Sequence, residues 1–414
     1  MRNNAIVGQS GGPTSVINSS LAGVFRSAID RGVNKVYGMI NGVQGLLDRK
    51  YINMADYIVE DIDIELLKRT PASFLGSCRY KLPNIEEQAT FEKIFKILDE
   101  IDIGYFFYIG GNDSADTTMK LSTYAKQIGS PIKFIGIPKT IDNDLAVTDH
   151  TPGYGSAAKF IASITKEIIL DGRAYDLKNA TIVEVMGRNA GWLTGASALS
   201  IASDCEGPDF IFLPEYPINI DEFIEKSIKI LERKPLVAVV SEGLKIDDGR
   251  YVSELASDIR VTDAFGHKML TGTARYLAEN LMRKTKCKAR SIELSTIQRC
   301  AAHMVSRVDI TEAYQVGGAA VKAAMEGETA KVVTLIRESD DPYICTTGLA
   351  DVNVIANVEK KVPLEWITET RDFVTKDFTH YASPLIQSEL TPFMVSGMPQ
   401  HISLNSRGYR PDVR

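Results

Sequence analysis

The chain contains little cysteine, with five residues among 414. They are Cys78, Cys205, Cys287, Cys300 and Cys345. The number is odd and no two of them form a Cys-x-x-Cys pair, which argues against a disulfide framework and against a zinc site. We therefore expect reduced thiols and a cytoplasmic location.

Long apolar runs are also missing. No segment approaches the roughly 20 apolar residues that a membrane-spanning helix needs. The amino terminus has only a short apolar run after residues 1–4, which is not the pattern of a signal peptide. The sequence therefore predicts a protein that is neither exported nor inserted in a membrane.

Positive charge is not in excess either. The chain has 47 Lys and Arg against 53 Asp and Glu, for a formal net charge of -6. This balance provides no basic field for nucleic acid, so we expect no nucleic-acid partner. Any phosphate-bearing partner has to be held by local cations.

Short apolar runs alternate with segments of helical periodicity, a pattern typical of parallel βα units and an α/β fold. The expected strands are 5–8, 105–109, 133–137, 181–185, 210–213 and 236–240. The expected helices include 15–30, 156–171 and 221–233. Prolines interrupt the last hundred or so residues, where we expect packed extensions and no autonomous domain.

Two polar loops, 110–114 and 138–144, directly follow predicted strands. In an open α/β sheet the carboxyl ends of the strands form the ligand-binding edge, so both loops are expected to converge on one substrate. In the second loop, one of Asp142 and Asp144 can accept a hydroxyl proton while the other orients it or helps to hold Mg²⁺. Considered alone, this loop is better explained as an Asx turn that caps the next helix.

A glycine-rich loop, 8–14, lies between a predicted strand and a predicted helix. Glycine lets the backbone approach a phosphate, and a helix amino terminus offers free N–H groups. The loop lacks the Gly-Lys-Ser/Thr ending of a Walker A motif and the Gly-x-Gly-x-x-Gly fingerprint. By itself it is equally consistent with an anion site and with an ordinary tight turn.

Taken together, several segments resemble phosphofructokinases, and two of them resemble the pyrophosphate-dependent branch. The general motifs are Gly-Gly-Asn-Asp-Ser at 110–114, Pro-Lys-Thr-Ile-Asp-Asn-Asp at 138–144, the segment 184–192 and Ile-Gln-Arg at 297–299. The branch motifs are Asp-His-Thr-Pro-Gly at 149–153 and Asp-Ala-Phe-Gly-His at 263–267. The likeness runs to about residue 318. It implies two similar doubly wound, Rossmann-like domains with the active site in the cleft between them.

The resemblance implies reversible phosphoryl transfer from pyrophosphate to the 1-hydroxyl of fructose 6-phosphate, with Mg²⁺ as cofactor and Asp142 as the base. The residues implied in catalysis are Asp142, Lys139, Asp113, Asp144 and Arg188. Those implied in sugar-phosphate binding are Thr140, Ile141, Met186, Gly187, Glu242, Arg290, Thr296 and Arg299. Those implied in diphosphate binding are Gly11, Gly12, Arg79 and Gly111, and Asn112 stands at the metal position.

Two residues predict the phosphoryl donor. The ATP-dependent branch has glycine at the positions of Asp113 and Lys139. The Asp113 carboxylate would collide with and repel the third phosphate of ATP, and Lys139 would stabilise the transferring group of pyrophosphate. The alternative is that Asp113 is a helix N-cap and Lys139 a solvated lysine.

Three positions depart from the family pattern. Asn112 replaces the usual aspartate of the metal loop, so Asp113, water or pyrophosphate can take over metal coordination. Thr296 stands where many ATP-dependent members have histidine. Asn179 stands where those members have an arginine that reaches a second subunit, and that contact stays unassigned.

The resemblance also implies an organisation. We expect a phosphoryl-donor-binding domain of residues 1–153 and about 298–350, and a sugar-phosphate-binding domain of 154–297 and about 351–414. A homo-oligomer, dimer or tetramer, is implied, with Arg290 donated across the subunit interface. Three alternatives stay open: an ATP-dependent phosphofructokinase, a sedoheptulose 7-phosphate kinase, and a regulatory subunit that binds sugar phosphate without catalysis.

Overall fold

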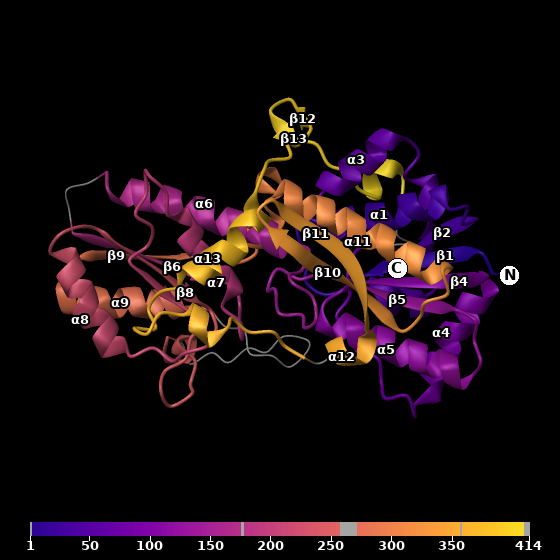
Figure 1. Ribbon diagram of the computed structural model, residues 1–414, viewed down its shortest axis with the longest axis horizontal. Helices are drawn as coiled ribbons and strands as arrows, with labels where there is room; N and C mark the ends of the chain where they lie inside the picture. Colours follow the sequence, from indigo (N-terminus) through magenta and orange to yellow (C-terminus); the bar gives the residue numbers. More distant parts are fainter. Residues whose placement is uncertain (1, 175–177, 257–270, 357, 410–414) are drawn as a thin grey trace.

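Two β-sheets with helices on both of their faces form two lobes that lie side by side (Figure 1). The computed structural model describes residues 2–174, 178–256, 271–356 and 358–409. The motif at 263–267 lies outside these residues. Both sheets are mainly parallel, which confirms the predicted α/β class.

The first sheet has seven strands in the order β11-β10-β5-β4-β1-β2-β3. Its five inner strands are parallel, and the edge strands β3 and β11 pair antiparallel with their neighbours. The strands are β1 (Asn4–Gln9), β2 (Lys35–Met39), β3 (Tyr51–Asn53), β4 (Ile103–Gly110), β5 (Lys133–Pro138), β10 (Lys331–Asp340) and β11 (Tyr343–Asp351).

The second sheet has four parallel strands in the order β7-β8-β6-β9. They are β6 (Asn179–Val185), β7 (Phe210–Phe212), β8 (Leu236–Ser241) and β9 (Lys288–Glu293). All six predicted strands are confirmed, three in each sheet. The short or polar strands β2, β3 and β9 were not predicted, because they lack a clear apolar run.

The helices cover both faces of each sheet. They are α1 (Ile17–Asp30), α2 (Gly42–Leu47), α3 (Asp61–Arg69), α4 (Gln88–Glu100), α5 (Asn112–Gln127), α6 (Tyr154–Gly172), α7 (Trp192–Gly195), α8 (Ile220–Leu231), α9 (Thr273–Thr285), α10 (Ile297–Cys300), α11 (Arg307–Met325), α12 (Val352–Ile355) and α13 (Lys376–Ala382). The predicted helices correspond to α1, α6 and α8 and are confirmed.

The core follows from the alternation of side chains along the inner strands. In β4, Phe107 and Ile109 point to the face that α1 and α11 cover, whereas Phe106 and Tyr108 point to the face that α2, α4 and α5 cover. Helices α1 and α11 approach closely because glycines lie at their crossing. A Cβ on Gly23 would meet the carbonyl oxygen of Tyr314 at 2.1 Å.

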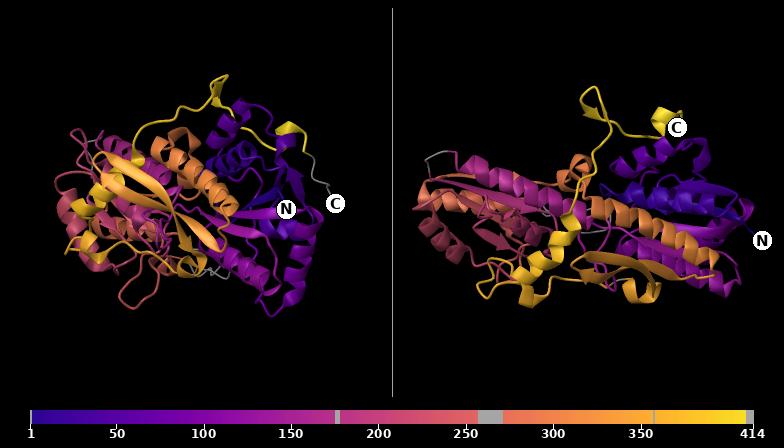
Figure 2. Two further views of the ribbon diagram at one scale, coloured as in Figure 1. Left: turned by 45° about the vertical axis from the view of Figure 1, so that its right-hand side comes forward. Right: turned by 45° about the horizontal axis from the view of Figure 1, so that its top comes forward.

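The carboxyl-terminal part is more regular than the sequence predicted, since β10 and β11 extend the first sheet. Residues between Val362 and Leu385 pack against the second lobe, around Trp192. Ile402 and Leu404 pack against the first lobe, although the predicted division places 351–414 with the second domain. The short hairpin of β12 (Met394–Val395) and β13 (Met398–Pro399) stands away from both lobes (Figure 2).

A buried charge network fastens the segment after β5 to α11 and β10. His150 lies between two carboxylates, with Nδ1 at 3.0 Å from Asp149 and Nε2 at 2.6 Å from Glu312. Arg337 pairs with Asp149 at 2.9 Å, and the Tyr343 hydroxyl donates to Glu312 at 2.7 Å. Burial lowers the pKa of His150, but Glu312 and Asp149 outweigh it and raise this pKa to about 9.

This network predicts a pH-dependent stability. The folded pKa of His150 lies above its unfolded value of 6.5, so its contribution is complete below pH 6.5 and is lost as the pH rises through about 9. The contribution is on the order of 3 kcal/mol. Urea unfolding at pH 6.5 and pH 9.5 should show a larger loss of stability in the wild type than in His150→Gln.

The exposed His380 provides the matched control. His380→Gln should keep the wild-type dependence on pH. Equal pH dependence in the wild type and in His150→Gln would contradict the assignment.

Candidate active site

The register of the first sheet brings three loops together. Gln9 pairs with Ile109, and Ile109 pairs with Ile137, so β1, β4 and β5 end at the same level. The loops that follow these strands line a cleft of about 440 Å³, and residues of the second lobe line its other side. The predicted site residues in this cleft are Gly11, Gly12, Arg79, Gly111, Asn112, Asp113, Lys139, Thr140, Ile141, Asp142, Asp144, Met186, Arg188, Glu242 and Arg299.

The glycine-rich loop lets two cations approach its backbone. Gly11 has a φ of +74°, and a Cβ there would lie 3.3 Å from the Lys139 ammonium. A Cβ on Gly12 would lie 2.8 Å from a guanidinium nitrogen of Arg299. The Lys139 ammonium donates to the carbonyl oxygen of Gly12 at 2.7 Å. One cation from each lobe therefore lies next to the loop, an arrangement that suits an anion.

The loop after β5 is fixed by its own hydrogen bonds. The Thr140 hydroxyl accepts from the Asp142 amide at 3.1 Å and donates to the Asp142 carboxylate at 3.4 Å. Asn143 is buried, and its side-chain oxygen accepts from the Thr151 amide at 3.1 Å. The next helix, α6, begins only at Tyr154, with Gly153 as its N-cap. The alternative that this loop caps the following helix is therefore wrong.

Burial changes the acidity of the groups in the cleft. It lowers the pKa of Lys139 to about 8, although Asp142 acts in the opposite direction. It raises the pKa of Asp142, although Lys139 opposes this, and it raises the pKa of Asp144 to about 7 with a further contribution from Asp142. Burial also raises the pKa of Glu242 to about 7. Carboxylates with raised pKa values in a cleft suit proton transfer near neutral pH.

The start of α5 places Asn112 and Asp113. The N-cap of this helix is Gly111, so Asp113 lies in the first turn and is exposed to the cleft. Lys139 is only 3% exposed. The alternative of an Asp113 N-cap with a solvated Lys139 is therefore wrong. The carbonyl oxygens of Ile355 at 3.2 Å and Val358 at 3.3 Å assign the side-chain nitrogen of Asn112 to the position that faces them, because only a nitrogen can donate to both.

The second lobe contributes the end of β6 and the start of the segment after β8. The Glu242 amide donates to the carbonyl oxygen of Val185 at 2.9 Å, which sets the two segments side by side. Gly187 is buried behind the cleft and has a φ of +124°, and a Cβ there would meet the carbonyl oxygen of Ala190 at 2.7 Å. Gly187 thus shapes the backbone on which Met186 and Arg188 reach the cleft.

Gly187, Arg290 and Thr296 do not line the cleft. Arg290 lies on β9 and lines a separate cavity of about 260 Å³ together with Glu167 and Asp171. Thr296 is exposed just before α10. Asn179 begins β6, and its amide donates to the carbonyl oxygen of Gly172 at 3.3 Å.

Sequence reasoning missed several residues of the cleft, including Tyr80, Asn189 and Glu359. Tyr80 and Asn189 are next to predicted site residues in the sequence, so adjacency could have indicated them. Glu359 comes from the carboxyl-terminal stretch, which carries no motif. Only the tertiary structure brings it to Asp144.

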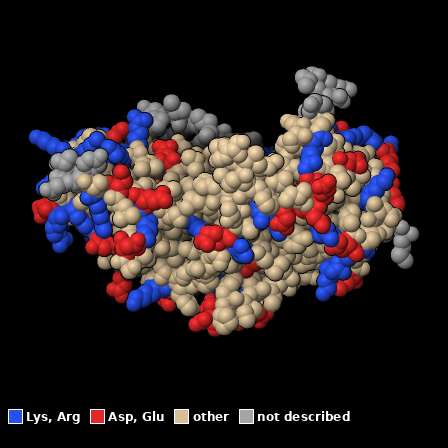
Figure 3. Space-filling view, turned by 90° about the horizontal axis from the view of Figure 1, so that it is seen from above, with Lys and Arg blue, Asp and Glu red and all other residues tan. Residues whose placement is uncertain are grey.

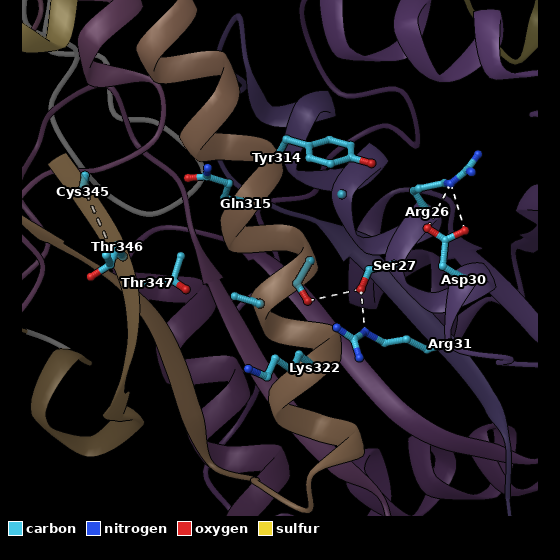
Figure 4. A pocket seen from close by; sticks show the side chains of 13 residues that line it. Arg26, Ser27, Asp30, Arg31, Tyr314, Gln315, Lys322, Cys345, Thr346 and Thr347 are labelled. Atoms are coloured by element: carbon cyan, nitrogen blue, oxygen red, sulfur yellow. Dashed lines mark hydrogen bonds and ion pairs between the residues drawn. The ribbon is translucent and has the colours of Figure 1, made fainter. Parts of the chain in front are cut away.

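A larger cavity, of about 750 Å³, lies between α1, α11 and β11 (Figure 4). Three of its charged side chains have partners within the wall. Arg26 pairs with Asp30 at 3.0 Å, and Arg31 donates to the Ser27 hydroxyl at 3.2 Å. None of the predicted site residues lines this cavity. The smaller cleft is therefore the candidate active site.

The surface carries charges of both signs. On the face drawn in Figure 3, acidic and basic side chains are interspersed around a largely uncharged centre. Among the described residues, none of the helices has the length and apolar character that crossing a membrane requires.

Comparisons with known proteins agree with this geometry. The phosphofructokinase family model matches residues 4–324. The pyrophosphate–fructose 6-phosphate 1-phosphotransferase of Halomonas elongata is 38% identical over 407 residues, which cover 96% of this chain and 95% of that protein. The protein of the same name from Methylococcus capsulatus is 38% identical over 408 residues, which cover 97% of this chain and 96% of that protein.

The fold comparison agrees as well. The crystal structure of a pyrophosphate-dependent phosphofructokinase from Marinobacter aquaeolei matches with a TM-score of 0.87 at 36% identity, and the match covers 100% of this chain and 98% of that chain. The predicted pair of Rossmann-like lobes is confirmed by this similarity and by the two sheets. The match of the family model over most of the chain establishes the family. The chain therefore belongs to the phosphofructokinase family.

Proposed function

We propose that this protein reversibly transfers a phosphoryl group from pyrophosphate to the 1-hydroxyl of fructose 6-phosphate, giving fructose 1,6-bisphosphate and phosphate. The observation that carries the proposal is the position of Lys139. Its buried ammonium lies in the cleft beside the glycine-rich loop, with Asp113 and Asp142 among the other groups there. A buried cation flanked by carboxylates suits a compact anion that arrives with a metal ion.

Asp142 acts as the base. Its carboxylate accepts the proton of the 1-hydroxyl as the new bond between oxygen and phosphorus forms and the bridging bond of pyrophosphate breaks. The leaving phosphate takes the bridging electrons, and the proton leaves Asp142 for solvent. The contact with Thr140 orients the carboxylate, and Asp144 lies next to it in the cleft. The raised pKa of Asp142 makes it a stronger base than an exposed carboxylate.

Lys139 stabilises the transferring phosphoryl group. Phosphoryl transfer depends mainly on positioning and on electrostatic stabilisation of the equatorial oxygens. Arg79, Gly11, Gly12 and Gly111 bind the diphosphate, the glycines through their backbone. The glycines leave space for the anion, and Arg79 lines the cleft next to Tyr80.

The second lobe binds the sugar phosphate. Arg188, Met186 and Glu242 contact the sugar together with Thr140 and Ile141, and Arg299 holds the 6-phosphate. A guanidinium can donate two parallel hydrogen bonds to phosphate oxygens. Gly187 acts through the backbone. Arg290 lies outside the cleft of its own chain, which favours its donation to a second copy of the chain in a homo-oligomer.

Mg²⁺ fits the donor set of the cleft. Asp113 and Asp144 line the cleft and would offer carboxylate oxygens, the ligands that this ion prefers, which leaves Asp142 as the base. Asn112 would act through its amide oxygen, because its nitrogen faces the carbonyl oxygens of Ile355 and Val358. When bound, the ion neutralises the charge of pyrophosphate. Such an enzyme would act in the cytoplasm. The donor would lie mainly on residues 1–153 and about 298–350 and the sugar mainly on the rest of the chain. Thr140 and Ile141 would reach the sugar from the first lobe, and Arg299 lies on α10, which contacts α6 of the second lobe.

The first test is steady-state turnover of fructose 6-phosphate with Mg²⁺, comparing pyrophosphate with ATP on one preparation. We expect turnover with pyrophosphate and none with ATP, because the Asp113 carboxylate repels a third phosphate. Turnover with ATP alone would overturn the assignment of the donor. Turnover with neither donor would overturn the proposed function.

Asp142→Ser should remove most of the turnover. Because a general base acts mainly in the transition state, we expect kcat to fall by on the order of 10²- to 10⁴-fold. Binding of fructose 6-phosphate, measured by calorimetry, should stay the same. Asp221→Asn, at the exposed start of α8, is the control. Unchanged turnover in Asp142→Ser would contradict the role of the base.

The double variant Asp113→Gly with Lys139→Gly tests the choice of donor. It removes the Asp113 carboxylate, which keeps ATP out of the cleft, and the Lys139 ammonium, which balances the negative charge of pyrophosphate. We expect kcat/KM for pyrophosphate to fall by about 10²-fold, the typical loss when one electrostatic stabiliser is removed. Turnover with ATP should become measurable. Wild-type kinetics with pyrophosphate in this variant would contradict the argument.

A further inference from the structure

The carboxyl-terminal segment around Lys360 runs beside the loop that carries Asp142 and Asp144. The Lys360 amide donates to the carbonyl oxygen of Asp144 at 2.7 Å, and Glu359 forms an antiparallel bridge with Leu145. Glu359 also lines the cleft. A stretch more than 200 residues away in the sequence is thus paired with the catalytic loop.

The side chain of Lys360 holds the far end of this loop. Its ammonium donates to the carbonyl oxygen of Asp149 at 2.6 Å and to that of Thr148 at 3.3 Å. It also lies 5.1 Å from the ring centroid of Trp192, whose indole N–H donates to the Lys360 carbonyl oxygen at 3.0 Å. Lys360 does not line the cleft itself. Its contacts are with the backbone that positions the site.

Tyr381 of α13 also holds the loop that follows β5. Its hydroxyl donates to the carbonyl oxygen of Asp149 at 2.8 Å and accepts from the side-chain nitrogen of Asn143 at 2.8 Å. The carbonyl oxygen of Asp149 therefore receives hydrogen bonds from both Lys360 and Tyr381. Each donor comes from the carboxyl-terminal part of the chain.

The conformation of the loop needs such support. Asn143 has a φ of 55° and Val147 a φ of 66°, both in the left-handed region. For a β-branched residue such as Val147 this backbone is unusual, and a strained residue costs roughly 1–3 kcal/mol. The surrounding contacts have to supply that free energy. Lys360 and Tyr381 are two of these contacts, and both come from the carboxyl-terminal part of the chain.

We propose that Lys360 is a positioning residue of this enzyme, which holds the carbonyl oxygens of Thr148 and Asp149 and thereby the loop that presents Asp142 and Asp144. The identity of the reaction that the loop serves rests on the proposed function. The charged groups that act on Lys360 are Asp149 and Asp144, which favour its ammonium form, and Arg337, which opposes it. Burial is the largest effect and lowers the pKa of Lys360 to about 8.

Lys360→Met tests the proposal, because it keeps an unbranched apolar stem against Trp192 and removes the donors. We expect kcat with pyrophosphate to fall by on the order of 10²-fold, the cost of a misplaced catalytic group, with the KM for fructose 6-phosphate unchanged. Lys360→Arg keeps donors and charge and should restore part of kcat. Lys361→Met, at the exposed neighbouring position, should behave as the wild type.

Tyr381→Phe is a second variant that removes only a hydroxyl. It should lower kcat in the same way and by a smaller factor, since Lys360 still holds the Asp149 carbonyl oxygen. In the background of Asp142→Ser, Lys360→Met should cause little further loss, because both act on one group. If the double variant loses kcat by the product of the two single losses, the proposal is overturned. A wild-type kcat in Lys360→Met would overturn it as well.

Hydrogen exchange gives a readout that does not need turnover. In Lys360→Met the amides of residues 140–151 should exchange faster, while those of β1 and β8 keep their wild-type rates. Faster exchange throughout the second lobe would show a general loss of folding and would overturn the proposal. If the wild type shows no turnover of fructose 6-phosphate with pyrophosphate or with ATP, the proposed function fails. The hydrogen-exchange result still decides whether Lys360 positions the loop.

Discussion

The structure depends on holding one loop, 139–153, in a conformation that Asn143 and Val147 within it disfavour. Helix α11, strand β10 and the segment around Lys360 hold it. Asp309 of α11 accepts from the amides of Gly153 and Ser156 at 2.8 Å each, and Leu335 of β10 accepts from the Asp149 amide at 2.9 Å. His150 is enclosed by the carboxylates of Asp149 and Glu312, and Lys360 holds the carbonyl oxygens of Thr148 and Asp149. The loop joins β5 of the first lobe to α6 of the second, so the same contacts set the cleft between the lobes.

Burial gives the cleft its chemistry. Removing water from Lys139, Asp142 and Asp144 disfavours their charged forms and moves their pKa values towards neutrality. In the proposed function, an anionic substrate that arrives with a metal ion would restore the balance, because it would supply the opposite charges that the buried groups lack. Burying these groups therefore costs free energy in the empty cleft, and a bound anion would recover it. This is the expected property of a site that stabilises a charged transition state.

In the proposed function, the choice of phosphoryl donor depends on two residues, Asp113 after β4 and Lys139 after β5. Asp113 in the first turn of α5 places a carboxylate at the cleft where the family resemblance puts glycine in the enzymes that use ATP. Lys139, buried beside Gly12, adds the compensating cation. The two residues are 26 positions apart in the sequence, but Gly110 pairs with Pro138, so β4 and β5 deliver both to one edge. In the proposed function, steric exclusion of ATP by Asp113 and charge compensation by Lys139 would act as a pair, and either residue alone would explain less.

The sequence by itself determined the α/β class, six of the strands and most of the residues of the cleft. Apolar runs indicate the inner strands of parallel sheets. The motifs at the strand ends are short and continuous in the sequence, so they can be recognised without the fold. It could not determine that Asn112 faces residues 355–358, that Gly187 lies behind the cleft, or that Glu359, Lys360 and Tyr381 reach the catalytic loop. The contacts of Asn112, Lys360 and Tyr381 join residues more than 200 positions apart, which leave no periodicity in the chain. Only tertiary packing, which decides where the carboxyl-terminal stretch lies, brings them to the site.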